Sequence, residues 1–163
     1  MSRPTPPGPL GSVENPIPRR AARIILIDQA GRVLLFRGFD PAEPSRRYWF
    51  TAGGGLDEHE DSREGAVREL REETGLDVPA ESLGEPVWHE VTEFPYDGRW
   101  YRQEQDFYAV RVGSWKVNVE GFSTEERRSI DDHRWWSLAE LDTTTERFYP
   151  AELPELVRGI LNR

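Results

Sequence analysis

The chain of 163 residues contains no cysteine and a single lysine, Lys116. Without cysteine it forms no disulfide, no thiolate metal site and no cysteine nucleophile, and we expect a cytoplasmic protein. No stretch approaches the roughly 20 consecutive apolar residues that a membrane span needs. No apolar run follows the first charged residue, as one would in a signal peptide. We therefore expect no membrane partner.

Acidic residues outnumber basic ones, and the formal net charge is −9. This charge argues against a broad nucleic-acid-binding surface. The excess is concentrated, because residues 57–73 carry eight carboxylates against three arginines. Much of the excess negative charge therefore lies in this one segment.

The first 18 residues hold six of the thirteen prolines and few large apolar groups. We interpret residues 1–18 as a flexible tail and residues 19–163 as one domain, which is large enough to bury its own core. Residues 23–27 and 33–36 are apolar runs around a turn, which predicts a hairpin. A short aromatic strand at residues 48–51 then leads into Gly53-Gly54-Gly55.

Residues 62–74 have helical periodicity. Asp61 or Ser62 is positioned to cap this helix, with Glu64 at capping-box spacing from Asp61, and Gly75 suits a left-handed cap at its end. The apolar side chains that recur at helical spacing are expected to face inward: Ala66, Val67, Leu70 and Thr74.

Strand patterns resume after Pro79. They cover residues 86–92, 100–112 and 133–137, with a hairpin turn at Asp97-Gly98. Residues 138–141 form a turn of helix and residues 154–161 a terminal helix. Trp135 and Trp136 should face opposite sides of their strand. Strands with one central and one terminal helix predict a mixed α+β domain.

Three glutamates gather on one side of the central helix. Glu69 is three residues from Glu72 and four from Glu73, so the three point the same way, and their like charges repel. The apolar stripe lies about 100° away by helical periodicity, so we expect an exposed acidic face. A hard divalent cation such as Mg²⁺, which favours carboxylate oxygens and bridges them to phosphates, would offset the repulsion. A solvated acidic face is the alternative interpretation.

The triple glycine lets the backbone approach a ligand closely. It leads into a helix start and not to a P-loop lysine, so it is no Walker-type cradle. Taken alone, it is also compatible with a plain tight loop.

These features combine in a specific spacing. Gly54 is followed after five residues by Glu60, and after seven more by Arg68-Glu69-Leu70, with Glu72-Glu73 and Gly75-Leu76 each one residue further on. This pattern matches every fixed position of the Nudix box, nine positions over 23 residues. The chain therefore resembles the Nudix hydrolase family (MutT-like) over roughly residues 20–161. The resemblance implies an α/β/α sandwich with a mixed central sheet and a box helix at residues 62–75.

The resemblance also implies a reaction, the hydrolysis of a nucleoside diphosphate linked to another moiety, with Mg²⁺ or Mn²⁺ as cofactor. By position, Glu72 and Glu73 resemble the main metal ligands, and Glu69 a further ligand or the base that activates water. Arg68 would orient Glu69. Glu60 would support the loop or touch a metal, and Gly54 or its neighbour would offer a backbone carbonyl.

Some family members take the base from a later loop, for which Glu125 and Glu126 are candidates; a solvated loop pair is the alternative. Trp49 and Phe50 are candidates for stacking a ring, unless they are core. The arginines that could meet a phosphate, if they are not simply solvated, are Arg37, Arg46 and Arg47.

Three rival interpretations remain. A noncatalytic binding module on the same fold would usually lose box carboxylates, and this box is whole. An isomerase on this fold would need a cysteine. A structural Ca²⁺ domain would show an EF-hand loop, and none is present. Homodimerisation, which the family often shows, is possible.

Overall fold

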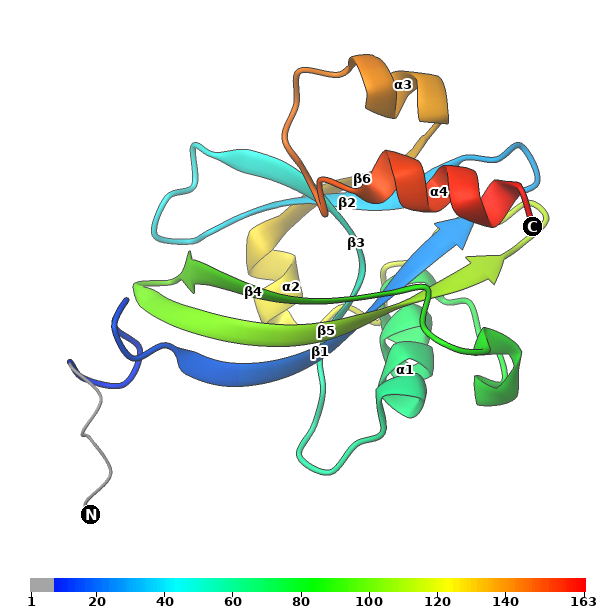
Figure 1. Ribbon diagram of the computed structural model, residues 1–163. Helices are drawn as coiled ribbons and strands as arrows, with labels where there is room; N and C mark the ends of the chain where they lie inside the picture. Colours follow the sequence, from blue (N-terminus) through cyan, green and yellow to red (C-terminus); the bar gives the residue numbers. More distant parts are fainter. Residues whose placement is uncertain (1–7) are drawn as a thin grey trace.

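Seven strands form one curled, mixed sheet in the computed structural model, which describes residues 8–163 (Figure 1). The strands are β1 (Ile17–Ile27), β2 (Val33–Phe39), β3 (Arg47–Gly55), β4 (Trp88–Tyr96), β5 (Arg99–Arg111), β6 (Ile130–Trp136) and β7 (Phe148–Tyr149). The helices are α1 (Ser62–Thr74), the 3₁₀ turn η1 (Ala80–Leu83), α2 (Thr124–Ser129), α3 (Leu138–Thr143) and α4 (Leu153–Leu161). The expected α+β class is confirmed.

The sheet runs in the order β4-β5-β1-β2-β3-β7, and β6 also pairs with β2. The pairings β1–β5 and β3–β7 are parallel, and the others are antiparallel. Strand β3 changes partner along its length: its first part pairs with β2, from Arg47 to Thr51, and its last part pairs with β1. This switch brings the three glycines against β1, beneath α1.

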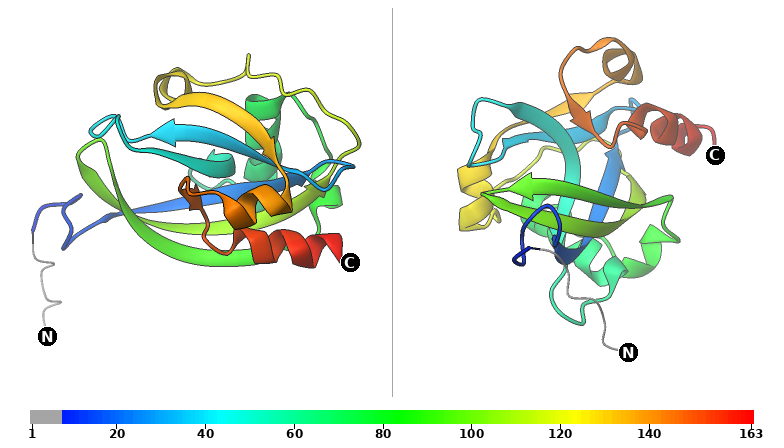
Figure 2. Two further views of the ribbon diagram at one scale, coloured as in Figure 1. Left: turned by 90° about the horizontal axis from the view of Figure 1, so that it is seen from above. Right: turned by 60° about the vertical axis from the view of Figure 1, so that its left-hand side comes forward.

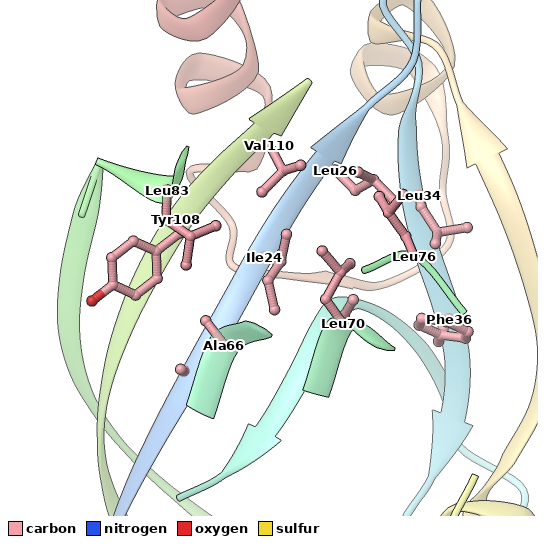
Figure 3. Packing of buried hydrophobic residues seen from close by; sticks show 12 residues of the cluster. Ile24, Leu26, Leu34, Phe36, Ala66, Leu70, Leu76, Leu83, Tyr108 and Val110 are labelled. Carbon is pink, nitrogen blue, oxygen red and sulfur yellow. The ribbon is translucent and has the colours of Figure 1, made fainter. Parts of the chain in front are cut away.

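Alternating side chains of the strands feed two cores on opposite faces of the sheet. In β1, Ile24 and Leu26 face α1, whereas Ile25 and Ile27 face α4. Figure 2 shows α1 on one side of the sheet and α3 and α4 on the other. In Figure 3, Ala66 and Leu70 of α1 point into the first core. Trp136 belongs to the second core and Trp135 packs on the first, as their adjacency predicted.

Helix α1 begins and ends where the sequence placed it. Gly75 adopts the left-handed conformation with φ 78° and donates to the Arg71 carbonyl. The capping box expected between Asp61 and Glu64 is wrong, because the Asp61 side chain makes no capping hydrogen bond. Instead the Ser62 hydroxyl, in the first turn, donates to Asp106 of β5 at 2.9 Å. The N-terminal end of the helix is thus tied to β5.

The predicted strand at residues 48–51 extends in both directions and includes the glycines. The turn at Asp97-Gly98 has φ of 50° and 82°, as a tight hairpin between β4 and β5 requires. Part of the tail proposed for residues 1–18 lies outside the described residues, and β1 begins at Ile17 within it. Among residues 8–163, no helix combines the length and apolar character needed to cross a bilayer.

Candidate active site

Arg68 organises the acidic residues at the start and middle of α1. Its guanidinium makes a two-pronged contact with Glu60, at 2.8 and 2.9 Å, and also donates to the Gly55 carbonyl at 3.2 Å. The remaining N–H groups reach Glu69 at 3.1 Å and Glu72 at 3.2 Å. Hydrogen bonds from Arg68 lower the pKa of Glu60 to about 2. One arginine therefore links the loop after β3 to two carboxylates of the helix.

The expectation that the acidic face of α1 is exposed was wrong for two of its three glutamates. Glu69 is 7% exposed and Glu73 is fully buried. Helix α1 packs against both β1 and β3, so the flank that carries these carboxylates is covered along with the apolar stripe. Burial raises the pKa of Glu69 and, more strongly, that of Glu73. Two acids held out of water need compensation, since buried charges are normally paired or bound to metal.

Only one of the two carboxylate oxygens of Glu73 has a hydrogen-bond partner among residues 8–163. Its Oε1 accepts the backbone N–H of Gly53 at 2.9 Å. Its Oε2 is buried and has no hydrogen-bond partner among residues 8–163. A carboxylate oxygen in this position is suited to ligate a cation, whose charge would favour the ionised form of Glu73.

A third carboxylate completes the group. Glu69, Glu73 and Glu126 each offer an oxygen, and these oxygens all lie within 4.8 Å of one another. Glu126 comes from α2, a single turn fixed by a capping box in which the Ser123 hydroxyl accepts the Glu126 N–H and Glu126 accepts the Ser123 N–H. An all-oxygen donor set with an unpartnered buried oxygen fits a hard divalent cation. We refer to these three residues as the carboxylate cluster.

The glycines make room for this cluster. A Cβ on Gly54 would lie 2.9 Å from Oε1 of Glu69, and a Cβ on Gly53 would lie 2.2 Å from the Ala22 carbonyl oxygen. Gly53 also has a φ of 129°, which side-chain-bearing residues rarely adopt. At Gly53 the backbone of β1 leaves no room for a side chain, whereas at Gly54 the space is occupied by the Glu69 carboxylate.

Not every site residue proposed from the sequence lies near the cluster. Glu72 is half-buried and turns to Arg68 instead of joining the three converging carboxylates. Both carboxylate oxygens of Glu60 likewise accept hydrogen bonds from Arg68. Glu125 is exposed on α2, whereas its neighbour Glu126 points inward. The geometry thus brings together Glu69, Glu73 and Glu126 and places the other acids around them.

The proposed substrate contacts divide between the two faces of the sheet. Trp49 is 3% exposed and packs in the α4-side core, at 5.2 Å from the Trp136 ring, so its placement does not fit a role in stacking substrate. Phe50 faces the α1 side and is half-buried. Arg37 and Arg47 both bind Asp131 at 2.8 Å. These two arginines are held in an ion-pair network rather than left free for a phosphate.

One residue near the cluster was not singled out from the sequence. Arg23 of β1 donates to the Gly53 carbonyl at 3.1 Å, and its charge acts on Glu73 and Glu69. The signal for it was present, since Arg23 is the one charged residue between Ala21 and Ile27 of β1. Its position against the glycines depends on the β1–β3 pairing, which the local pattern does not reveal.

Comparison with known proteins agrees with this geometry. The NUDIX domain family model matches residues 17–156. An RNA pyrophosphohydrolase of Caulobacter vibrioides is 30% identical over 146 residues, covering 85% of this chain and 81% of the relative. A protein of the same name from Dinoroseobacter shibae is 36% identical over 112 residues, covering 63% and 68% of the two chains.

Solved structures show the same fold. The MutT protein of Methanosarcina mazei superposes with a TM-score of 0.62 at 19% identity, covering 90% of this chain and 94% of that one. The E. coli ORF135 protein gives a TM-score of 0.55 at 25% identity, covering 95% and 94%. From the family match, the relatives and the fold together, we conclude that the chain belongs to the Nudix family and is an enzyme of the pyrophosphohydrolase class.

Proposed function

We propose that the chain uses a divalent cation, Mg²⁺ or Mn²⁺, to hydrolyse a phosphoanhydride bond in a nucleotide-like substrate. The observation that carries this proposal is the carboxylate cluster, in which Oε2 of Glu73 is buried and has no hydrogen-bond partner in the described part of the chain. When bound, such an ion would neutralise the diphosphate and lower the pKa of a nearby water.

Each residue of the site would have a defined role in holding the cation. Glu73 and Glu69 would hold the cation, with the backbone carbonyl of Gly54 as a further oxygen ligand. Glu72 would join them at the outer side, next to Arg68. Arg68 fixes the Glu69 carboxylate by a charge-assisted hydrogen bond.

The reaction is hydrolysis, so a water oxygen forms a bond to phosphorus and a P–O–P linkage breaks. The proton of the attacking water passes to a carboxylate, for which Glu69 and Glu126 are the two candidates. Phosphoryl transfer depends on positioning and charge stabilisation, so the chain needs no nucleophilic side chain.

The relatives named RNA pyrophosphohydrolase indicate which substrate to test first. Internal linkages of RNA are phosphodiesters, so the phosphoanhydride bond of an RNA lies at a 5′-polyphosphate end. Only that end needs to enter the site, which is compatible with the net charge of −9.

The experiment that tests the proposal is a substrate screen. The protein is incubated with Mg²⁺ or Mn²⁺ and 5′-triphosphorylated RNA, free nucleoside triphosphates, ADP-ribose, nucleotide sugars or dinucleoside polyphosphates, and both products are identified. We expect divalent-ion-dependent cleavage of one class, abolished by EDTA. Binding of a nucleotide without any release of phosphate or pyrophosphate would favour a noncatalytic module.

A further inference from the structure

Arg23 connects β1 to the glycine segment that orients Glu73. Its Nη1 donates to the Gly53 carbonyl at 3.1 Å and its Nε donates to Oε1 of Gln105 at 3.3 Å. Arg23 and Gly53 are also directly opposite each other in the β1–β3 pairing. Both acceptors of this half-buried arginine are uncharged, so it holds backbone and amide groups and forms no close ion pair with any of residues 8–163.

Gly53 is held on both sides by side chains. Its N–H donates to Oε1 of Glu73 at 2.9 Å, and its carbonyl accepts from Arg23. The φ of 129° turns this residue away from regular strand geometry. Arg23 thus holds the carbonyl side of Gly53, and Glu73 accepts from its N–H side.

The other end of Arg23 is fixed from β4 and β5. Gln105, 7% exposed, donates through Nε2 to Glu90 at 2.6 Å and accepts the Nε2 of Gln103 at 2.9 Å through Oε1. An ionised Glu90 only accepts, so the Gln105 amide has one favourable orientation, with Oε1 toward Arg23. A chain of hydrogen bonds thus runs from β4 through Gln105, Arg23 and Gly53 to Glu73.

We propose that Arg23 is a positioning residue: by holding the Gly53 carbonyl it fixes this glycine, so that the Gly53 N–H locks Oε1 of Glu73 and leaves Oε2 free for a divalent cation. This inference rests on the proposed role of Glu73 as a metal ligand. It assigns to a residue outside the Nudix box a part in building the metal site.

The direction in which the affinity for metal changes when Arg23 is replaced separates this role from a simple charge effect. The positive charge of Arg23 acts on Glu73 and Glu69 and opposes a cation bound there. If charge were all that mattered, removing it would tighten metal binding. If Arg23 holds the ligand in place, removing it loosens metal binding.

The test is the affinity of the substrate-free protein for Mn²⁺, followed by electron paramagnetic resonance. Arg23→Met removes both charge and hydrogen bonds, and Arg23→Lys keeps the charge but cannot span Gly53 and Gln105. We expect both to weaken Mn²⁺ binding about 10-fold or more, as does the loss of a residue that orients a metal ligand. The control is Arg102→Met, an exposed arginine of the adjacent strand β5, which should change the affinity less than about twofold.

Equal or tighter Mn²⁺ binding by Arg23→Met would overturn the inference. If that variant does not fold, as judged by thermal unfolding, Arg23→Lys and Gln105→Met decide the question, since both keep the positive charge; unchanged affinity in both would overturn it. A wild-type protein that binds no Mn²⁺ would instead refute the proposed function. Wild-type binding with unaffected Arg23 variants would refute only the role of Arg23.

Discussion

Glu73 accepts the backbone N–H of Gly53 at 2.9 Å through one carboxylate oxygen, while the other oxygen lies buried without a partner among residues 8–163. A strand glycine thus orients an acid from the facing helix and leaves it one free, desolvated oxygen. Such an arrangement costs stability in the metal-free protein. We regard that cost as the consequence of a site built for a cation.

Glu73→Gln should therefore separate stability from activity. Burial raises the pKa of Glu73 well above its ordinary value. Protonated Glu73 therefore contributes to the stability of the fold at any pH below its unfolded pKa, and this contribution is lost as pH rises through its folded pKa. Glutamine cannot ionise, so with EDTA at pH 8 the variant should melt at a higher temperature than wild type, and the difference should shrink near pH 4.5. Turnover should fall about 100-fold or more. Near-normal turnover would contradict the assignment of Glu73.

Glu60→Gln should change how steeply the free energy of unfolding falls at acid pH. Arg68 lowers the pKa of Glu60 from 4.5 to about 2, so this carboxylate stabilises the fold above its unfolded pKa and loses that contribution as pH falls toward 2. Between pH 5 and pH 2 the wild type should lose about 2 to 3 kcal/mol more than the variant in urea unfolding. Glu58→Gln, at an exposed position, is the control and should behave like wild type. Parallel curves for wild type and Glu60→Gln would show that the Arg68 contact is not stabilising.

Gly54→Ala should damage the site with little damage to the fold. The added Cβ would lie 2.9 Å from Oε1 of Glu69, and a carboxylate at the end of a flexible side chain can move away. We expect weaker Mn²⁺ binding and a kcat reduced about tenfold or more. Gly159→Ala in α4 is the control: no atom lies within 4 Å of its Cβ, and it should gain up to about 1 kcal/mol of helix stability with unchanged kcat. Equal kcat values for the two variants would argue against Glu69 acting from this position.

Arg47→Met should leave KM within about twofold of wild type. Arg47 and Arg37 both bind the carboxylate of Asp131, so we expect Arg47 to make no contact with substrate. Loss of its exposed ion pair should cost about 1 kcal/mol of stability or less. Steady-state kinetics on the substrate identified by the screen would check this. A tenfold rise in KM would place Arg47 in contact with substrate, as its type and position in the sequence first indicated.

Local sequence patterns predicted helix α1 and the Asp97-Gly98 turn because short-range periodicity and turn chemistry determine both. The burial of Glu69 and Glu73 was missed for the opposite reason. Helical spacing gives the angle between side chains, but the covering of that flank depends on β3 leaving β2 to pair with β1. No local pattern reports such a change of partner.

Helix α2 was missed although its signal was in the sequence. Ser123 and Glu126 have capping-box spacing, and the structure forms that box, whereas the one expected at Asp61 does not form. A helix of six residues has too few turns to show an apolar stripe. The convergence of Glu126 with Glu69 and Glu73 joins residues more than 50 positions apart, which requires the tertiary structure.

The most direct test of the central claim is anomalous diffraction from crystals of the protein soaked in Mn²⁺. We predict an anomalous peak bounded by oxygens of Glu69 and Glu73, with Oε2 of Glu73 as a ligand and Glu126 adjacent. A crystal in which Mn²⁺ binds elsewhere, or leaves Oε2 of Glu73 without a contact even with a substrate analogue present, would contradict the account.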